Sequence, residues 1–271
     1  MRRYNSLDFD GGSRKRVSYI AVTLALAVVS LGVAFLWQKS ESKSFAPTVA
    51  NEKQEITPEI SRDGKKYEEE TIISKSEYVT SSYFDDACFI GDSLTTGIET
   101  YGILDNAKVL ATIGINVDTI KSTPFYEHEG KSLTALEALE ELDGINKIYV
   151  MLGSNGIAWL SKDSLISSYR EFVLEIQKIK PEATIYIQSI LPVTKTLSDL
   201  ANNISNDKID QYNAQLVSLA KELGCYYVDV NSELKDEEGC LPEYASQSDG
   251  MHLTSEYYVH WIDYLKCHTA P

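Results

Sequence analysis

Residues 87–97 read ACFIGDSLTTG, an apolar run that stops at Gly91-Asp92 and continues directly into Ser93. The apolar half is typical of a buried strand, and the polar half is typical of the start of a helix. This pattern places the Ser93 hydroxyl at the carboxyl end of a strand and the amino end of a helix, where open α/β sheets gather their chemistry. Ser93 is therefore a candidate nucleophile, and a plain helix cap is the alternative interpretation.

Strand-like and helical patterns alternate along the chain from this segment onward. The expected strands cover residues 87–90, 107–113, 147–152, 184–190 and 226–230, and the expected helices cover residues 94–101, 133–142, 164–179, 207–223 and 255–266. Each helix has apolar residues at spacings of three or four, which gives it one apolar face. Five apolar strands separated by helices predict an α/β domain over residues 81–271, a three-layer α/β/α sandwich with a mostly parallel five-stranded sheet.

The amino-terminal region has a different character. No charged side chain occurs in the 22 positions from Val17 to Gln38, and about 20 apolar residues suffice for a helix to cross a bilayer. We therefore expect one transmembrane helix, a signal anchor, over residues 17–37. Five arginine and lysine side chains precede it, so residues 1–16 are expected in the cytoplasm and the domain outside the cell membrane. A cleaved signal peptide is the alternative.

Residues 38–80 are rich in Ser, Glu and Lys and contain few large apolar side chains, which predicts a flexible extracytoplasmic tether. Residues 1–40 carry six basic and two acidic groups, a net charge of +4. Because the net charge of the whole chain is −15, residues 41–271 carry a net charge of −19. An acidic domain argues against nucleic acid as a partner, because phosphates require a basic surface.

Small and polar residues follow several of the expected strands. Ser93 follows the first strand, Gly114 the second and Asn155 the third, while Asp249 and His252 lie in the loop before the last helix. A hydroxyl, backbone donors, an amide and an Asp/His pair are the groups that acyl transfer requires. The other three histidines, His128, His260 and His268, are interpreted as surface or packing residues.

The four segments together resemble the block motifs of the SGNH hydrolase superfamily, the GDSL-type serine esterases, lipases and acylhydrolases. The matching motifs are Gly91-Asp-Ser-Leu94, Gly114, Gly153-Ser-Asn155 and Asp249-Gly-Met-His252, in the family's order. The resemblance implies an SGNH/flavodoxin-like fold. It also implies a catalytic triad of Ser93, His252 and Asp249, and an oxyanion hole formed by Ser93, Gly114 and Asn155. The family's third block usually continues with an aspartate, and here Gly156 stands at that position.

The expected function is a membrane-tethered serine esterase that hydrolyses carboxylic esters through an acyl-enzyme on Ser93. An O-acetylated cell-surface polysaccharide is the preferred substrate, and a lipid or lysophospholipid ester or transfer of the acyl group to a sugar hydroxyl are alternatives. A non-catalytic surface-binding protein with the same fold is an alternative of another class. It would explain Gly156 but not the presence of the other motif residues.

No cofactor and no metal are expected. Asp249 and His252 lack further ligands at a recognisable spacing, and no phosphate-cradling lysine motif accompanies Ser93. The sequence leaves the oligomeric state open. It also leaves the cysteines open: Cys240 or Cys225 with Cys267 are candidate disulfides, and four free thiols are the alternative.

Overall fold

The computed structural model describes residues 71–200 and 203–271, which lie in one compact unit. The predicted cytoplasmic segment, the transmembrane helix over 17–37 and most of the tether lie outside the described residues. Among the residues that are described, no helix is long and apolar enough to cross a membrane.

Five parallel strands form the central sheet, in the order β2-β1-β5-β6-β7. They are β1 (Ala87–Gly91), β2 (Lys108–Ala111), β5 (Lys147–Met151), β6 (Thr184–Gln188) and β7 (Tyr226–Val228). The order reverses between β1 and β5, because the chain goes from β1 to the edge strand β2 and then returns to the other side of β1. Open α/β sheets bind their ligands at such a switch point, beyond the carboxyl ends of the strands.

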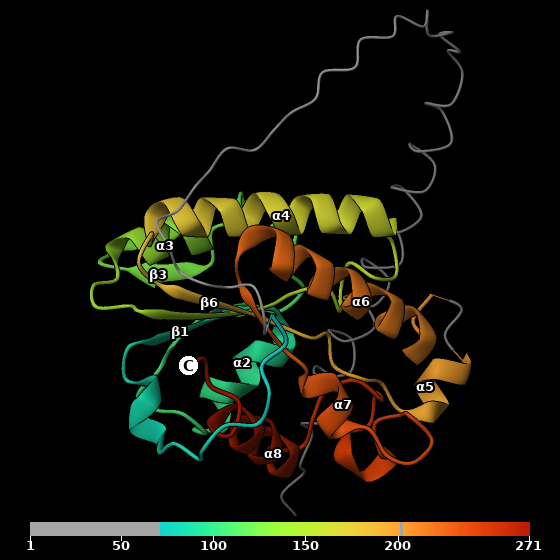
Figure 1. The fold of residues 1–271 in the computed structure, drawn as a ribbon. Coiled ribbons are helices and arrows are strands. Elements are labelled where there is room, and N and C mark those ends of the chain that lie inside the picture. Colours follow the sequence, from blue (N-terminus) through green and yellow to red (C-terminus); the bar gives the residue numbers. More distant parts are fainter. Residues whose placement is uncertain (1–70, 201–202) are drawn as a thin grey trace, which may run out of the picture. The chain divides into compact units, whose positions relative to one another are not determined.

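Helices cover both faces of the sheet (Figure 1). One face carries α3 (Ala135–Glu141), α4 (Lys162–Ile179) and α6 (Asn206–Leu223), and the other carries α2 (Ser93–Thr100), α7 (Val230–Leu234) and α8 (Ser255–Lys266). Side chains along each strand alternate between two cores. Ile148 and Val150 of β5 belong to the core between the sheet and α4. Tyr149 and Met151 belong to the core between the sheet and α8. The predicted three-layer α/β architecture with a five-stranded parallel sheet is therefore confirmed.

Several elements differ from the expected pattern. β2 ends at Ala111 rather than residue 113, because the chain turns into the loop that contains Gly114. A short hairpin, β3 (Tyr126–His128) and β4 (Lys131–Leu133), was not predicted, since its strands have only three residues each. Its turn contains Glu129 and Gly130, both with positive φ, as tight hairpin turns require. The short helices α5 (Lys195–Leu200) and α7 and the single 3₁₀ turns, η1 (Ser81–Phe84) and η2 (Glu243–Ala245), were also not predicted.

The segment before β1 packs on the domain from Thr71 onward. Tyr227 of β7 donates to Thr71 O (2.7 Å) and accepts from Ile73 N (3.0 Å) through its backbone, so residues 71–73 cover part of this sheet edge. Edge coverage removes exposed backbone groups that would otherwise pair with other chains. Residues 71–80, which the sequence assigned to the end of the tether, thus contribute to the domain.

Candidate active site

Ser93 is the first residue of α2 and lies directly beyond the carboxyl end of β1. Gly91 allows this sharp turn, because a Cβ at that position would lie only 2.0 Å from Thr95 Oγ1. Asp92 caps the helix: its Oδ1 accepts a hydrogen bond from Leu94 N at 3.0 Å. A capping carboxylate of this kind stabilises a helix by about 0.5–2 kcal/mol. The hydroxyl of Ser93 thus lies at the switch point, at the amino end of a helix dipole.

Two hydrogen bonds connect Ser93 to the loop before α8. Ser93 Oγ lies 2.8 Å from His252 Nε2, and His252 Nδ1 lies 2.5 Å from Asp249 Oδ2. The three predicted triad residues are therefore brought together, although Ser93 and His252 are 159 positions apart in the sequence. An acid, an imidazole and a hydroxyl in this order form the arrangement that activates a serine nucleophile.

Asp249 is held by its own loop. Its Oδ1 accepts hydrogen bonds from the backbone N–H groups of Met251 and His252, both at 2.9 Å. Partial burial raises the pKa of Asp249, but the hydrogen bonds from His252 and from these two backbone groups outweigh it and lower the pKa to about 2. The carboxylate is therefore ionised at neutral pH, with Oδ2 directed at the imidazole.

Gln247, within this loop, and Tyr101 of the serine helix connect the loop to the rest of the domain. The Gln247 amide donates to Tyr101 OH at 2.7 Å and to Leu253 O at 3.1 Å, and its backbone N–H donates to His252 O at 2.8 Å. Tyr101 is the C-cap of α2, the helix that begins with Ser93. Gln247 therefore links the histidine loop to the serine helix. No motif in the sequence indicated this role.

Asn155 and Gly114, the two remaining oxyanion candidates, lie in loops beyond β5 and β2. Asn155 Nδ2 donates to Ile115 O at 2.9 Å, which joins the two loops. Gly114 has φ of +80°, a conformation that residues with a Cβ rarely adopt, and it is exposed. No hydrogen bond in the described part of the chain joins either residue to Ser93 directly. A side-chain amide has two N–H donors, so one remains on Asn155 for a ligand.

Gly156 replaces the family's aspartate in a helical turn that begins at Gly153. Backbone hydrogen bonds from Ile157 N to Gly153 O and from Leu160 N to Gly156 O, both at 2.8 Å, hold this turn. A Cβ on Gly156 would lie 3.2 Å from Cδ1 of Leu160 and of Leu165. The position is thus enclosed by apolar side chains, and the loop that carries Asn155 is supported without the aspartate.

Asp92 has a second feature that the sequence did not reveal. Its side chain is fully buried, and Oδ2 has no hydrogen-bond partner among the described residues. Burial raises the pKa of Asp92 to about 6, although the Leu94 N–H, the nearby Ser154 hydroxyl and His252 all act to lower it. The burial of Asp92 depends on the packing of α2 and is not visible in the sequence.

No group of three or more His, Cys, Asp or Glu side chains within residues 71–200 and 203–271 is arranged to hold a metal ion. His268 stacks on Tyr264 with ring centroids 3.7 Å apart, and His260 lies edge-on to Tyr257. Cys240 and Cys267 are both free thiols, so neither of the two candidate disulfides is formed.

Comparisons with known proteins found a matching family model and similar solved structures. A model of the GDSL-like lipase/acylhydrolase family matches residues 89–259. A Streptococcus pneumoniae structure, provisionally named as a platelet activating factor, is similar over 69% of this chain and 89% of its own, with 20% identity and a TM-score of 0.53. A GDSL-like lipase from Bacteroides thetaiotaomicron is similar over 68% of this chain and 85% of its own, with 15% identity and a TM-score of 0.48. No curated protein matches the chain significantly.

Proposed function

We propose that this chain is a serine esterase tethered to the outside of the cell membrane. The premise is that it belongs to the GDSL-like lipase/acylhydrolase family, which confirms the resemblance to SGNH hydrolases. The observation that carries the proposal is the hydrogen-bonded chain Ser93–His252–Asp249 at the switch point of the sheet. Ser93 attacks the ester carbonyl, and the hydroxyl proton passes to His252 Nε2. His252 then returns this proton to the oxygen of the leaving alcohol.

The acyl group remains on Ser93 Oγ until water releases it. His252 takes one proton from that water, and the oxygen attacks the acyl carbon. Ser93 leaves with the proton that His252 returns, so the enzyme is regenerated and a carboxylic acid is released. Asp249 holds Nδ1–H of the imidazole throughout, which keeps Nε2 free to accept.

Each tetrahedral intermediate carries a negative oxygen. We assign its stabilisation to the backbone N–H groups of Ser93 and Gly114 and to the free N–H of the Asn155 amide. The N–H of Ser93 is the first of α2 and has no acceptor within the helix. Removing one oxyanion donor typically costs about 10²–10³ in kcat.

Measuring p-nitrophenol release by the wild type and by Ser93→Ala tests the esterase proposal. The full-length protein is assayed with p-nitrophenyl acetate beside Ser93→Ala and beside Ser167→Ala, which removes an exposed hydroxyl on α4. Release falls to the uncatalysed background only in Ser93→Ala. Equal rates for the wild type and Ser93→Ala contradict the esterase proposal and favour the non-catalytic binding protein.

The proposed location rests on the uncharged run at residues 17–37 and the basic residues before it. A surface location favours an O-acetylated cell-surface polysaccharide as the natural ester. Protease added to intact bacterial cells that express the full chain removes the domain if it lies outside. A domain that is degraded only after the cells are lysed contradicts the location.

A lipid or lysophospholipid ester is the second candidate, and two exposed side chains favour it. Ile113 precedes Gly114 and is 81% exposed, and Trp159 follows Asn155 by four positions and is 80% exposed. Both lie in the loops that carry the proposed oxyanion donors, where they would contact an apolar substrate. Acetate release from acetylated polysaccharide, compared with fatty-acid release from lysophospholipid vesicles, distinguishes the two substrates.

A further inference from the structure

Two asparagine side chains on α6 hold the chain segment that follows β6. Asn206 Oδ1 accepts from Val193 N at 3.0 Å, and Asn206 Nδ2 donates to Val193 O at 2.8 Å. Asn213 makes the same pair of bonds to Ile190, accepting from its N–H at 2.8 Å and donating to its carbonyl at 3.0 Å. The two asparagines are about two helical turns apart, so they lie on the same face of α6.

The held segment, residues 189–194, lies beyond the end of β6 and is buried along its whole length. Buried backbone groups outside a sheet need hydrogen-bond partners from elsewhere. Asn206 and Asn213, which are themselves buried, provide such partners at two points of the segment. Because both amides extend from one helix, they fix the course of residues 189–194 relative to α6.

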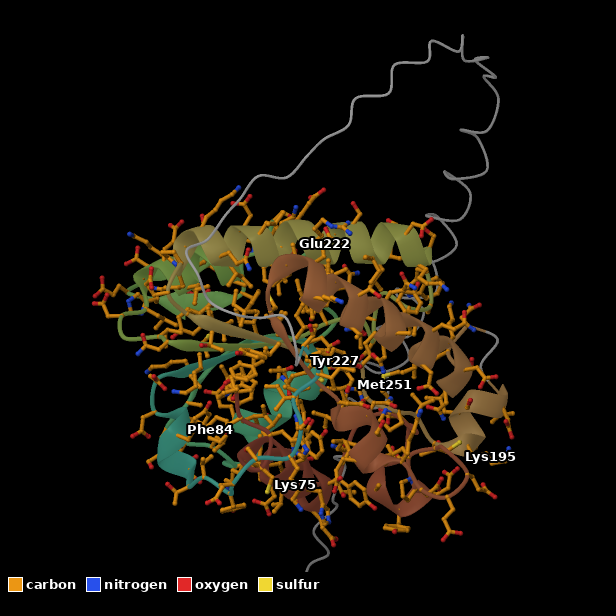
Figure 2. The ribbon with its side chains drawn as sticks, viewed as in Figure 1. Lys75, Phe84, Lys195, Glu222, Tyr227 and Met251 are labelled. Carbon is orange, nitrogen blue, oxygen red and sulfur yellow. The ribbon has the colours of Figure 1, made fainter. Side chains whose placement is uncertain are left out.

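The carboxyl end of this segment contacts the histidine loop, residues 246–252. Thr194 donates through its backbone N–H to Gly250 O, in the middle of the loop's Asp-Gly-Met-His turn, at 2.8 Å. Gly250 has φ of +79°, and a Cβ on it would lie only 2.6 Å from Thr194 Oγ1. The turn therefore rests directly against Thr194. Figure 2 labels Met251 in this loop and Lys195, the residue that follows Thr194.

The amino end of the segment contacts the loop that carries Asn155. Gly153 has φ of +136°, and a Cβ on it would lie 2.4 Å from Ile190 Cδ1. Gly153 O accepts from Ile157 N at 2.8 Å, which closes the turn that includes Asn155. Ile190 thus packs against the start of this turn, at the same residue whose backbone Asn213 holds.

Resting on the proposed function, we propose that Asn206 and Asn213 are positioning residues that align the two halves of the active site. Asn206 acts through residues 193–194 on the histidine loop, and Asn213 acts through Ile190 on the turn of Asn155. Both act on the segment rather than on the ester. The helix α6 then sets the position of the catalytic base relative to an oxyanion donor.

Kinetics with p-nitrophenyl acetate test the proposal in the full-length protein. Asn206→Ala and Asn213→Ala each lower kcat by about tenfold with KM unchanged, since each removes two hydrogen bonds that contribute a factor of about two to ten apiece. The matched control is Gln177→Ala, which removes an amide bond to Leu223 O at the carboxyl end of α6 and keeps the wild-type kcat.

A second substitution separates the two routes. In an Asn155→Ala background, Asn213→Ala lowers kcat by less than about twofold, because the donor that it positions is already absent. Asn206→Ala keeps its full loss in that background, because it acts through the histidine loop. If the losses of both asparagine variants multiply fully with that of Asn155→Ala, the effect of Asn213 is a general loss of packing and its positioning role is overturned.

The histidine route has a readout that needs no turnover. In full-length protein labelled with ¹⁵N-histidine, His252 Nδ1–H gives a downfield proton signal, which is assigned by its disappearance in Asp249→Asn. Asn206→Ala shifts or broadens this signal, whereas Asn213→Ala and Gln177→Ala leave it at the wild-type position. A signal that is unchanged in Asn206→Ala overturns the positioning role of Asn206.

A conservative variant keeps the test decisive if Asn206→Ala fails to fold. In Asn206→Asp, a protonated carboxyl offers Val193 one acceptor and one donor, as the amide does, whereas the ionised form offers acceptors only. Since burial raises the pKa of a carboxyl, kcat relative to the wild type falls as the pH rises from about 5 to about 8. A ratio that does not change with pH overturns the role of Asn206.

The two proposals fail in different ways. If the wild type matches Ser93→Ala on p-nitrophenyl acetate, the esterase proposal fails, while the His252 signal still reports the alignment of the loop. If the wild type is active and the asparagine variants behave like Gln177→Ala, the esterase proposal stands and the positioning roles are overturned.

Discussion

The histidine loop and the oxyanion loops differ in how they are built. Residues 246–252 form a closed unit, in which Asp249 accepts two backbone N–H groups and the imidazole within a span of four residues. Two of the oxyanion candidates, Gly114 and Asn155, come from separate loops, and a hydrogen bond from Asn155 Nδ2 to Ile115 O, 40 positions apart, joins these loops. A compact loop fixes its groups by local geometry, whereas the dispersed donors depend on how the strands place their ends. We expect the first region to respond to substitution in an all-or-none way and the second in a graded way.

Asp249→Asn is expected to have the largest effect in this comparison. The amide preserves the loop, because its oxygen still accepts from Met251 and His252. Its NH₂ group faces Nδ1 of the imidazole, which forces the tautomer with hydrogen on Nε2 and prevents that nitrogen from accepting the Ser93 proton. A loss of about 10⁴ in kcat is expected.

The matched control for this variant is Asp199→Asn, at an exposed ion pair with Lys195 on α5. It should keep full activity. A loss of less than tenfold in Asp249→Asn would mean that the histidine is oriented without this carboxylate.

Because the pKa of Asp249 is lowered to about 2, its ionised form also stabilises the fold above about pH 4, and this contribution is lost as the pH falls toward 2.

Asn155→Ala tests the dispersed region. It removes one oxyanion donor and the bond to Ile115 O, and kcat should fall by about 10²–10³ with little change in KM, because the donor acts on the intermediate rather than on the bound ester. Steady-state kinetics with p-nitrophenyl acetate measure both constants. Asn203→Ala, at an exposed asparagine, is the control. A kcat within threefold of the wild type would show that Asn155 only connects the loops.

The same contrast explains what the sequence predicts. The five strands, the helices and the Asp249–His252 pair are visible because each depends on local patterns: alternation of apolar runs, helical spacing, and two groups within one turn. The position of β1 beside β5 is not local, and it is this neighbour relation that brings the loop of Ser93 close to the loop of Asn155. The residue types that acyl transfer requires could be predicted from the sequence alone. That they lie together in space could be predicted only from the order of the family's motifs.

Features that arise from packing were beyond the sequence. The end of β2 at Ala111, the hairpin at 126–133 and helix α5 depend on tertiary contacts that override weak local preferences. Burial of Asp92 likewise follows from the packing of α2 against β1, β2 and α8.

Asp92 lies between the two regions and provides a test by pH. Burial raises the pKa of Asp92 to about 6, whereas its pKa in the unfolded chain is near 3.9. Between these two pH values Asp92 is protonated in the folded state and ionised in the unfolded state. Stability therefore decreases as the pH rises from about 4 to about 6, by an amount on the order of 3 kcal/mol, and then levels off. Asp92→Asn keeps an N-cap acceptor and should remove this slope.

Urea unfolding of the wild type and Asp92→Asn at a series of pH values between 4 and 7 measures the slope. Asp105→Asn, which alters an exposed carboxyl after α2, should retain the wild-type slope. Parallel curves for wild type and Asp92→Asn would mean that the unpartnered oxygen of Asp92 is solvated in solution, and the serine turn would then be less enclosed than the histidine loop.

Gln247→Ala is expected to have the smallest effect, because it leaves all three members of the Ser93–His252–Asp249 chain in place. The variant removes the bonds from the amide to Tyr101 OH and Leu253 O, which connect the histidine loop to the serine helix. One hydrogen bond contributes about 0.5–1.5 kcal/mol, so kcat should fall by roughly two- to tenfold through poorer alignment of His252, with KM unchanged.

Tyr101→Phe removes only one of the two bonds and should have a smaller effect in the same direction. Since both variants break the same link, the double variant should lose little more than Gln247→Ala alone. Additive losses, or a rise in KM at constant kcat, would show that the histidine loop is held by its internal bonds alone.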